Sequence, residues 1–319
     1  MTILTLAFAI AGSILASCFL CRSAFRIASK FALLDIPNRR KNHLHVTPLM
    51  GGIVLLAVFV PVSLPSIVSL AAPIHHSKLF ICVAVVFSMT FIGILDDRHS
   101  LSPRVRLWLS FAVFGCAAYF EPIFNVRVLD FEHPHLTFGL GTRGLAIAFT
   151  IFCCVGLVNA VNMADGKNGL VIGLCIGWLV LLMLRAPLEF IPIISLLLAV
   201  LGVLLSFNLR GKLFLGDGGA YGLASAIAMI AIAVYNSPGA HATRAMAAEE
   251  LVLLFAVPVL DSCRLTFKRV RKGLSPMAAD RDHLHHHMQE RFGWPTGLLL
   301  YWTLAILPNF LVYVSEIYA

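Results

Sequence analysis

The stretch LFICVAVVFSMTFIGILDDRHS (79–100) decides how this chain is interpreted. Residues 79–95 contain no charged side chain and are close to the ~17-residue minimum for a helix that crosses a bilayer. Two adjacent carboxylates, Asp96 and Asp97, follow at once. An ionisable side chain at the edge of the hydrocarbon is unfavourable, so its presence there indicates a functional site.

Two further acids lie beside apolar runs. Asp165 stands in NAVNMADGKNGL (159–170) and Asp217 in FLGDGGAYG (214–222). Tracing the chain through the bilayer places these segments on the same face as Asp96 and Asp97. Hard oxygen ligands gathered on one surface suit Mg²⁺ bound to a diphosphate.

The composition indicates an all-α polytopic membrane protein. The chain has 319 residues, of which 59% are hydrophobic and 13% charged, whereas a soluble domain is about 25% charged. The net charge of +8 comes from basic residues in short loops between apolar runs, which argues against a nucleic-acid partner and for contact with anionic lipid headgroups. The eight cysteines lie mostly inside apolar runs and indicate buried side chains rather than a disulfide framework.

We predict ten transmembrane helices in one integral-membrane domain that covers residues 1–319. The predicted spans are 2–21, 50–71, 79–95, 105–120, 143–161, 168–185, 189–207, 218–235, 248–262 and 294–315. Most lysines and arginines follow the odd-numbered spans, so these loops are predicted to be cytoplasmic and both termini periplasmic. The opposite side holds Lys78, Arg127, Arg143, Arg185 and Arg244. On that side, residues 121–142 alternate apolar and polar side chains, which predicts a short periplasmic β-hairpin.

Each acidic motif has a functional and a structural interpretation. Asp96 and Asp97 repel one another, so at least one of them needs a nearby cation or has a raised pKa; Arg98, Arg104 and Arg106 are candidate partners. The alternative is an ordinary helix end, although acids at a helix C-terminus oppose its dipole.

The amides that precede Asp165 are the second motif. Asn159 and Asn162 share one helical face, and Asp165 follows on the same side, where Gly166 and Gly169 let the chain turn. They either orient a carboxylate or phosphate oxygen, or form an interhelical hydrogen-bonding cluster.

The glycines around Asp217 let the backbone approach a ligand closely, and the helix that follows would offer free N–H groups to an anion. The alternative is an acidic N-cap with flexible neighbours.

Two loops carry further candidates. His283, His285 and His286 lie in a predicted cytoplasmic loop, 263–293. They suit phosphate and sugar contacts, a transition metal such as zinc, or a surface tract that binds no ligand. Lys41 lies between Pro37 and Pro48 in the first cytoplasmic loop, a setting that favours capture of a polyanion.

These five segments, in this order from Asp35 to His286, resemble the polyprenyl-phosphate N-acetylhexosamine-1-phosphate transferase family, part of glycosyltransferase family 4. The histidine segment is most similar to the branch that transfers GlcNAc 1-phosphate to undecaprenyl phosphate. The resemblance implies a multi-pass enzyme of the bacterial inner membrane with its active site on the cytoplasmic side. It implies transfer of a sugar 1-phosphate from a UDP-sugar to undecaprenyl phosphate, with release of UMP, as the first step of a cell-surface polysaccharide such as lipopolysaccharide or exopolysaccharide.

The resemblance also implies a cofactor and roles for individual residues. Mg²⁺, with Mn²⁺ as an alternative, would be bound by Asp217 and Asp97. Asp96, Asp97 and Asp165 would be the catalytic residues. Donor contacts would come from Lys41, Asn159, Asn162, Asn168, Phe214, His283, His285 and His286. Relatives in the family are often homodimers.

Two positions depart from the family pattern. Asn168 stands where relatives commonly carry Asp, at a position that helps to recognise the nucleobase. The segment from Asn208 to Asp217 is one residue shorter than usual, which leaves the role of Asn208 open.

Two other functions are compatible with intramembrane acids. A transporter would place them near the bilayer midplane on broken helices within inverted repeats, but here they cluster at one face and no repeat is visible. A membrane metal-dependent phosphatase would use the histidines instead.

Overall fold

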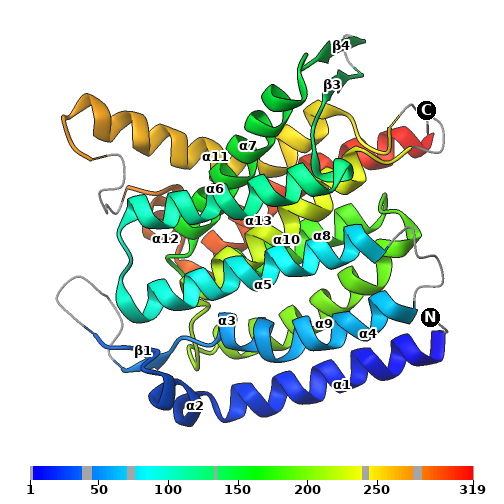
Figure 1. Ribbon diagram of the computed structural model, residues 1–319. Helices are drawn as coiled ribbons and strands as arrows, with labels where there is room; N and C mark the ends of the chain where they lie inside the picture. Colours follow the sequence, from blue (N-terminus) through cyan, green and yellow to red (C-terminus); the bar gives the residue numbers. More distant parts are fainter. Residues whose placement is uncertain are drawn as a thin grey trace. The chain divides into compact units, whose positions relative to one another are not determined.

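The computed structural model describes residues 3–37, 45–69, 76–132, 135–238, 244–275 and 282–318, and these are mostly helical (Figure 1). The long helices are α1 (Ile3–Arg22), α4 (Val60–Ser69), α5 (His76–His99), α6 (Pro103–Phe120), α7 (Arg143–Ala164), α8 (Leu170–Met183), α9 (Ile191–Asn208), α10 (Gly216–Tyr235), α11 (Ala248–Arg271) and α13 (Trp294–Tyr318). The shorter helices are α2 (Ala24–Phe31), α3 (Gly51–Val54), η1 (Leu55–Phe59), η3 (Pro122–Phe124), η4 (Leu188–Phe190) and α12 (Leu284–Phe292). Four strands, β1 (Leu34–Asp35), β2 (Thr47–Pro48), β3 (Val128–Phe131) and β4 (Leu136–Gly139), form two antiparallel pairs.

Within the described residues, helix covers most of each of the ten predicted spans. Among the described residues, six helices are long and apolar enough to cross a membrane: Ile3–Arg22, His76–His99, Arg143–Ala164, Leu188–Asn208, Gly216–Tyr235 and Trp294–Ser315. The segments Gly51–Pro65 and Leu170–Met183 are apolar but shorter. The multi-pass helical fold is therefore confirmed, while the number of ten spans and the side on which the termini lie stay predictions.

The predicted loop 263–293 is largely helical, which corrects the sequence interpretation. Helix α11 continues to Arg271, and residues 284–292 form α12. The charged continuation is stable as a helix because acidic residues occupy the first turn of α11 and Lys268, Arg269 and Arg271 the last, which matches the helix dipole.

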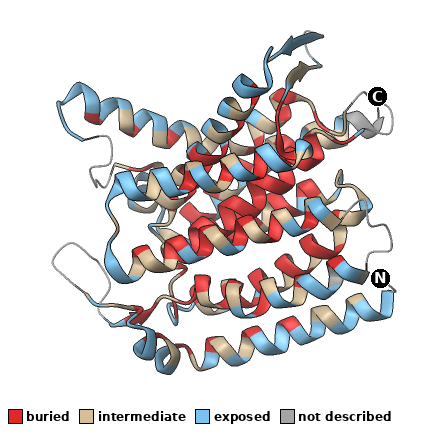
Figure 2. Ribbon diagram, viewed as in Figure 1, coloured by how far each residue is buried: buried red, intermediate tan, exposed pale blue. Residues whose placement is uncertain are grey.

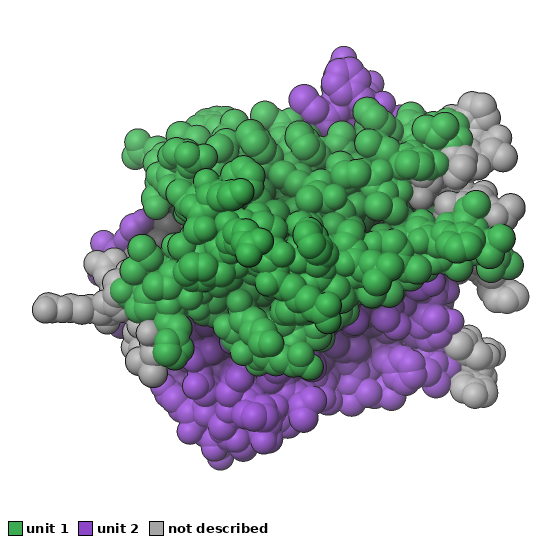
Figure 3. Space-filling view, turned by 90° about the horizontal axis from the view of Figure 1, so that it is seen from below, with its two compact units in different colours: residues 1–113, 187–226 green, residues 114–186, 227–319 purple. Residues whose placement is uncertain are grey.

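The chain divides into two compact units, coloured in Figure 3. Unit 1 comprises residues 1–113 and 187–226. Within it α1 packs along α9, and α4 packs against both α5 and α9. Ser13 and Ser17 are the buried residues of α1 before Cys21, and most of its apolar side chains are exposed. The pair β1–β2 closes the base of the first predicted cytoplasmic loop through the register Leu34↔Pro48.

Unit 2 comprises residues 114–186 and 227–319. In this unit α11 packs on α7 and α13, and α13 packs on α8. Arg185 and Glu250 form an almost completely buried ion pair at 2.6 Å, and Glu250 also accepts a hydrogen bond from Ala247 N at the start of α11.

The predicted β-hairpin is present in unit 2. Strands β3 and β4 pair in the register Val128↔Gly139 to Phe131↔Leu136. Tyr235, at the end of α10, holds the hairpin in place, because its hydroxyl donates to Val128 O (2.8 Å) and accepts from Asp130 N (2.9 Å). Helix α10 is buried from Gly218 to Tyr235 (Figure 2).

Candidate active site

Within unit 1, the end of α5 meets the start of α10 at Asp97. Its Oδ1 accepts a hydrogen bond from Asp217 N (2.9 Å) and its Oδ2 accepts one from Gly218 N (3.0 Å). A carboxylate at a helix N-terminus is stabilised both by the unpaired N–H groups and by the helix dipole. The prediction that α10 offers free N–H groups to an anion is therefore wrong for these two groups, because Asp97 occupies them.

Glycines allow α5 and α10 to come this close. A Cβ atom on Gly93 of α5 would lie 2.6 Å from Gly218 Cα, a distance that real side chains do not tolerate. Gly216 has a φ of +74°, and a Cβ atom there would lie 2.7 Å from Asp97 Oδ2. Glycine adopts this left-handed conformation without a steric penalty, so it turns the chain into α10 directly beside the carboxylate.

Gly93→Ala is expected to destabilise the protein by about 1–3 kcal/mol, because the added methyl group pushes α5 away from α10. The same movement separates Asp97 from Asp217 N, so enzyme activity should fall as well. Thermal unfolding in detergent measures the first effect. Gly12→Ala is the matched control, because a Cβ at Gly12 meets no atom within 4 Å. Equal stability of the two variants would contradict this account.

Asp96 has different surroundings from Asp97. Its side chain is 5% exposed and forms an ion pair with Arg106 of α6 at 2.6 Å. Arg106 also donates to the hydroxyl of Tyr221 (3.2 Å). Of the three arginines proposed from sequence, Arg106 is the one that neutralises this carboxylate. The two adjacent acids are therefore not equivalent.

Phe214 lies next to the end of the first predicted cytoplasmic loop. Phe214 N donates to Pro48 O (2.9 Å), and Met50 N donates to Phe214 O (3.0 Å), so the two segments form an isolated parallel β-bridge. Phe214 is half-buried two residues before Gly216. This pairing brings residues 48–50 to the segment before Asp217. Lys41 lies outside the described residues.

Within unit 2, the predicted amides lie at the end of α7. Asn159 donates its side-chain N–H to Val155 O (2.8 Å), one turn back in the same helix. Asp165 is the residue at which α7 ends, and its N–H donates to Asn162 O (3.1 Å). The turn that follows is held to α13 because Trp294 Nε1 donates to Asn168 O (3.1 Å). Asn159, Asn162, Asp165 and Asn168 are all half-buried.

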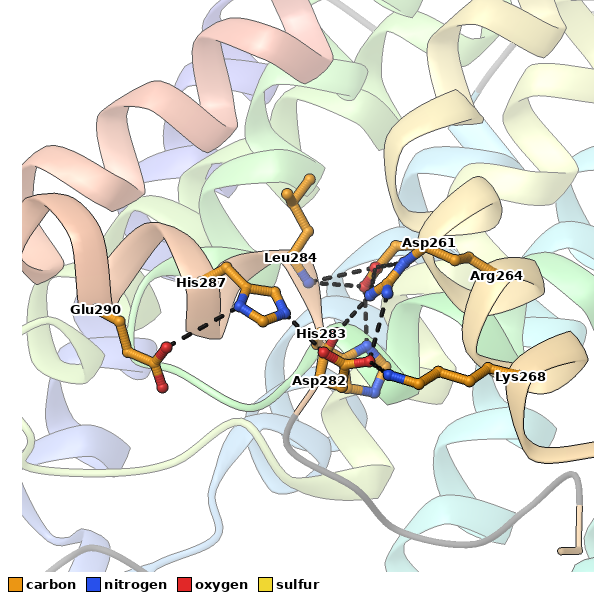
Figure 4. A network of polar contacts seen from close by, with 8 residues as sticks. All are labelled: Asp261, Arg264, Lys268, Asp282, His283, Leu284, His287 and Glu290. Carbon is orange, nitrogen blue, oxygen red and sulfur yellow. Dashed lines mark hydrogen bonds and ion pairs between the residues drawn. The ribbon is translucent and has the colours of Figure 1, made fainter. Parts of the chain in front are cut away.

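The histidine segment is anchored by Asp261 of α11 (Figure 4). Asp261 Oδ2 lies 2.9 Å from His283 Nδ1, and Leu284 N donates to both carboxylate oxygens (3.2 Å each). Arg264 donates to Oδ1 of the same carboxylate (2.9 Å). Asp261 and His283 are 8% and 7% exposed, so this carboxylate fixes one ring nitrogen of a buried imidazole.

A more exposed network surrounds this pair. Asp282 accepts hydrogen bonds from Lys268 and from Arg264, and it lies 2.7 Å from His287 Nε2 (Figure 4). These contacts, led by the Lys268 ammonium, hold the pKa of Asp282 well below its usual range. His287 is exposed, so the end of the histidine segment faces away from the buried part.

His285 is buried in a different way. Its side chain is 1% exposed, and neither ring nitrogen has a hydrogen-bond partner among the described residues. The ring packs against the turn after α7, since a Cβ atom on Gly166 would lie 2.7 Å from His285 Nε2. Burial, followed by the neighbouring His286 and His283, lowers the pKa of His285 to about 3. The imidazole is therefore neutral at physiological pH.

Acidification is expected to destabilise the fold through His285. The unfolded side chain binds a proton near pH 6.5, whereas the folded one binds it near pH 3, so stability is complete above pH 6.5 and is lost as the pH falls toward 3. The loss is about 1.4 kcal/mol between pH 7.5 and 5.5. The unfolding temperature should differ less between these two pH values in His285→Gln than in the wild type. An unchanged pH effect in that variant would assign the loss to other groups.

The acidic residues of unit 1 are chemically suited to Mg²⁺. Mg²⁺ is usually held by one or two carboxylates together with water and substrate phosphates. Asp97 and Asp217 supply such oxygens, and a divalent cation would offset their like charges. Within the described ranges, no group of three or more His, Cys, Asp and Glu side chains is arranged to hold a metal ion. The magnesium assignment, to Asp97 and Asp217, stays a prediction.

Comparison with known proteins gives one family. A model of glycosyl transferase family 4 matches residues 79–235. The undecaprenyl-phosphate alpha-N-acetylglucosaminyl 1-phosphate transferase of Yersinia pestis is 31% identical over 278 residues, which cover 82% of this chain and 71% of the relative. The proteins of the same name from Escherichia coli K12 and Salmonella typhi are each 29% identical, with the same coverage. The chain belongs to glycosyl transferase family 4. The resemblance inferred from the motifs is thereby confirmed.

The chain belongs to glycosyl transferase family 4, and six helices among its described residues are able to cross a membrane, so it is a multi-pass membrane protein. The family match spans α5 to α10 and so contains Asp96, Asp97, Asp165 and Asp217. The family match ends before Asp261. The sequence patterns indicated neither Asp261 nor Tyr221 as a site residue. The available signal was that Asp261, like the other acids, closes an apolar run.

Proposed function

We propose that this protein transfers an N-acetylhexosamine 1-phosphate from a UDP-sugar to undecaprenyl phosphate and releases UMP. The reaction would take place at the cytoplasmic face of the bacterial inner membrane and begin the synthesis of a cell-surface polysaccharide. The observation that carries the proposal is the pairing of Asp97 with the backbone of Asp217, in a chain whose relatives over 82% of its length are undecaprenyl-phosphate N-acetylglucosaminyl 1-phosphate transferases.

The proposed reaction is a direct phosphoryl transfer. An oxygen of the lipid phosphate forms a bond to the phosphorus that bears the sugar, and the bond from that phosphorus to the bridging diphosphate oxygen breaks. The electron pair leaves with UMP. Such a transfer requires positioning and charge neutralisation more than covalent participation by the protein.

The acidic residues of unit 1 are assigned to the diphosphate. Asp97 and Asp217 would hold Mg²⁺, which supplies charge neutralisation at the phosphate oxygens when it is bound. Asp97 is preorganised for this role, because two backbone N–H groups fix both of its oxygens. Asp96, paired with Arg106, would hold the guanidinium beside the acceptor phosphate. Phe214 presents a half-buried ring for stacking on the nucleobase.

The residues of unit 2 are assigned to the donor. Asn159, Asn162 and Asp165 would orient its phosphates and sugar, and Asn168 would contact the nucleobase. His283, whose Nδ1 is held by Asp261, would contact a phosphate or sugar oxygen through Nε2. His285 and His286 would add further contacts. Lys41, which is not part of unit 2, would bind a phosphate.

Purified protein with undecaprenyl phosphate, Mg²⁺ and a panel of UDP-sugars tests the proposal. Release of UMP that requires the lipid, together with a lipid product carrying a sugar diphosphate, is the expected result. Release without the lipid would indicate a hydrolase. No release with any UDP-sugar, combined with uptake of a solute into proteoliposomes, would favour a transporter instead.

A further inference from the structure

Helix α2 is a short amphipathic helix that directly follows the apolar helix α1. Its buried residues, Ala24 and Ala28, lie on the face that packs toward β2. Phe25 and Phe31 of the same helix are 58% and 52% exposed. A helix with one packed face and exposed aromatic side chains, placed where a membrane helix ends, is suited to the interface between lipid headgroups and acyl chains.

The bend where α1 ends and α2 begins is called the α1–α2 elbow. Three basic residues lie at helical spacing along it: Arg22, Arg26 and Lys30. All three are exposed. Their charged groups form no hydrogen bond or ion pair within the part of the chain that the structure describes. Like charges four residues apart on a helix repel one another, so an anion bound between them would be stabilising.

The elbow is also hollowed. Arg22, Ser23, Phe25 and Arg26 line an open hollow of about 460 Å³. Ser23 begins α2 without using its hydroxyl as a cap, so that group is available to a ligand. Two guanidinium groups and a hydroxyl around one hollow match the oxygens of a phosphate, which arginine binds through two parallel hydrogen bonds.

The apolar surroundings identify the source of that phosphate. On α1, Leu15 and Phe19 are 71% and 69% exposed, and they lead toward the hollow. An acyl chain lying along these side chains would bring its own phosphate to Arg22 and Arg26, whereas a free nucleotide or inorganic phosphate would gain nothing from them. We propose that the α1–α2 elbow, formed by Arg22, Ser23, Phe25 and Arg26, binds the headgroup of an anionic phospholipid whose acyl chains lie along α1.

Native mass spectrometry of the full chain, extracted from nanodiscs of phosphatidylglycerol and phosphatidylcholine, tests this site. Wild-type protein should retain phosphatidylglycerol in preference to phosphatidylcholine. The double variant R22Q/R26Q should retain phosphatidylglycerol about 30-fold more weakly. Each basic residue at a membrane surface contributes about 1 kcal/mol, and each 1.4 kcal/mol corresponds to a tenfold change in affinity.

The double variant R271Q/K272Q is the matched control, because it removes two exposed basic residues at the end of α11. It should retain the lipid as the wild type does. Equal losses of phosphatidylglycerol in the two double variants would indicate nonspecific electrostatic attraction instead of a site at the elbow. Unchanged retention in R22Q/R26Q would overturn the proposal. Displacement of the lipid by millimolar inorganic phosphate would show a phosphate site that is not specific for lipid. R22K/R26K keeps the charge and the fold but lacks the guanidinium geometry, so it should lose part of the preference.

Discussion

Asp217→Asn is expected to lower turnover by about 10³-fold while the protein remains folded and inserted. The substitution removes one negative charge from the residue assigned to the metal-bound diphosphate, and the loss of one preorganised electrostatic contact commonly lowers kcat by about 10²–10³-fold. The backbone N–H of residue 217 still donates to Asp97, so the junction between α5 and α10 is kept. UMP release at saturating UDP-sugar and lipid measures the effect.

Two comparisons separate chemistry from folding in this experiment. Asp130→Asn removes one carboxylate from the β-hairpin, outside the acidic motifs, and should leave turnover within about threefold. Asp97→Ala should lose activity and, in addition, about 0.5–2 kcal/mol of stability, because Asp97 caps α10 through two N–H groups. Normal turnover by Asp217→Asn would remove Asp217 from the proposed metal site.

The sequence predicted the helices and the positions of the acids well, because these depend on local patterns. Apolar runs of span length became helices, and Asp96, Asp97 and Asp217 fell at helix ends as expected. The partner of each acid did not follow from such patterns. Asp97 caps a helix that begins about 120 residues later, and Asp96 pairs with Arg106, one of three equally plausible arginines.

The role of Asp261 was hidden for a related reason. The density of Lys and Arg after residue 262 indicates a loop when read as a membrane topology signal, but these residues are good helix formers and α11 continues to Arg271. Arg264 and Lys268 therefore share a helix with Asp261 and face the histidine segment together (Figure 4). The distance between Asp261 and His283 in the sequence gave no sign of their contact.

Asp261→Asn is expected to lower kcat by about 10²-fold, because the amide cannot reproduce a carboxylate that accepts from His283 and Leu284 N at once. Exchanging the carboxylate that orients a histidine for an amide favours the wrong ring tautomer and can be very costly to turnover. Asp261→Glu, which keeps the charge, should recover part of the activity. Asp282→Asn is the matched control: it contacts the exposed Lys268 and His287 and should stay within about threefold of the wild type.

A double-mutant cycle distinguishes positioning from a general structural role. If Asp261 acts through His283, the double variant Asp261→Asn/His283→Gln should be no slower than His283→Gln alone, since residues that act as a unit are strongly non-additive. If Asp261 only stabilises the junction of α11 and α12, the losses of kcat in the two single variants should multiply in the double variant. The unfolding temperature of Asp261→Asn should then fall together with its kcat. If the losses multiply while stability is unchanged, Asp261 acts neither through His283 nor by stabilising the junction of α11 and α12. Asp261 would then have to contact substrate directly.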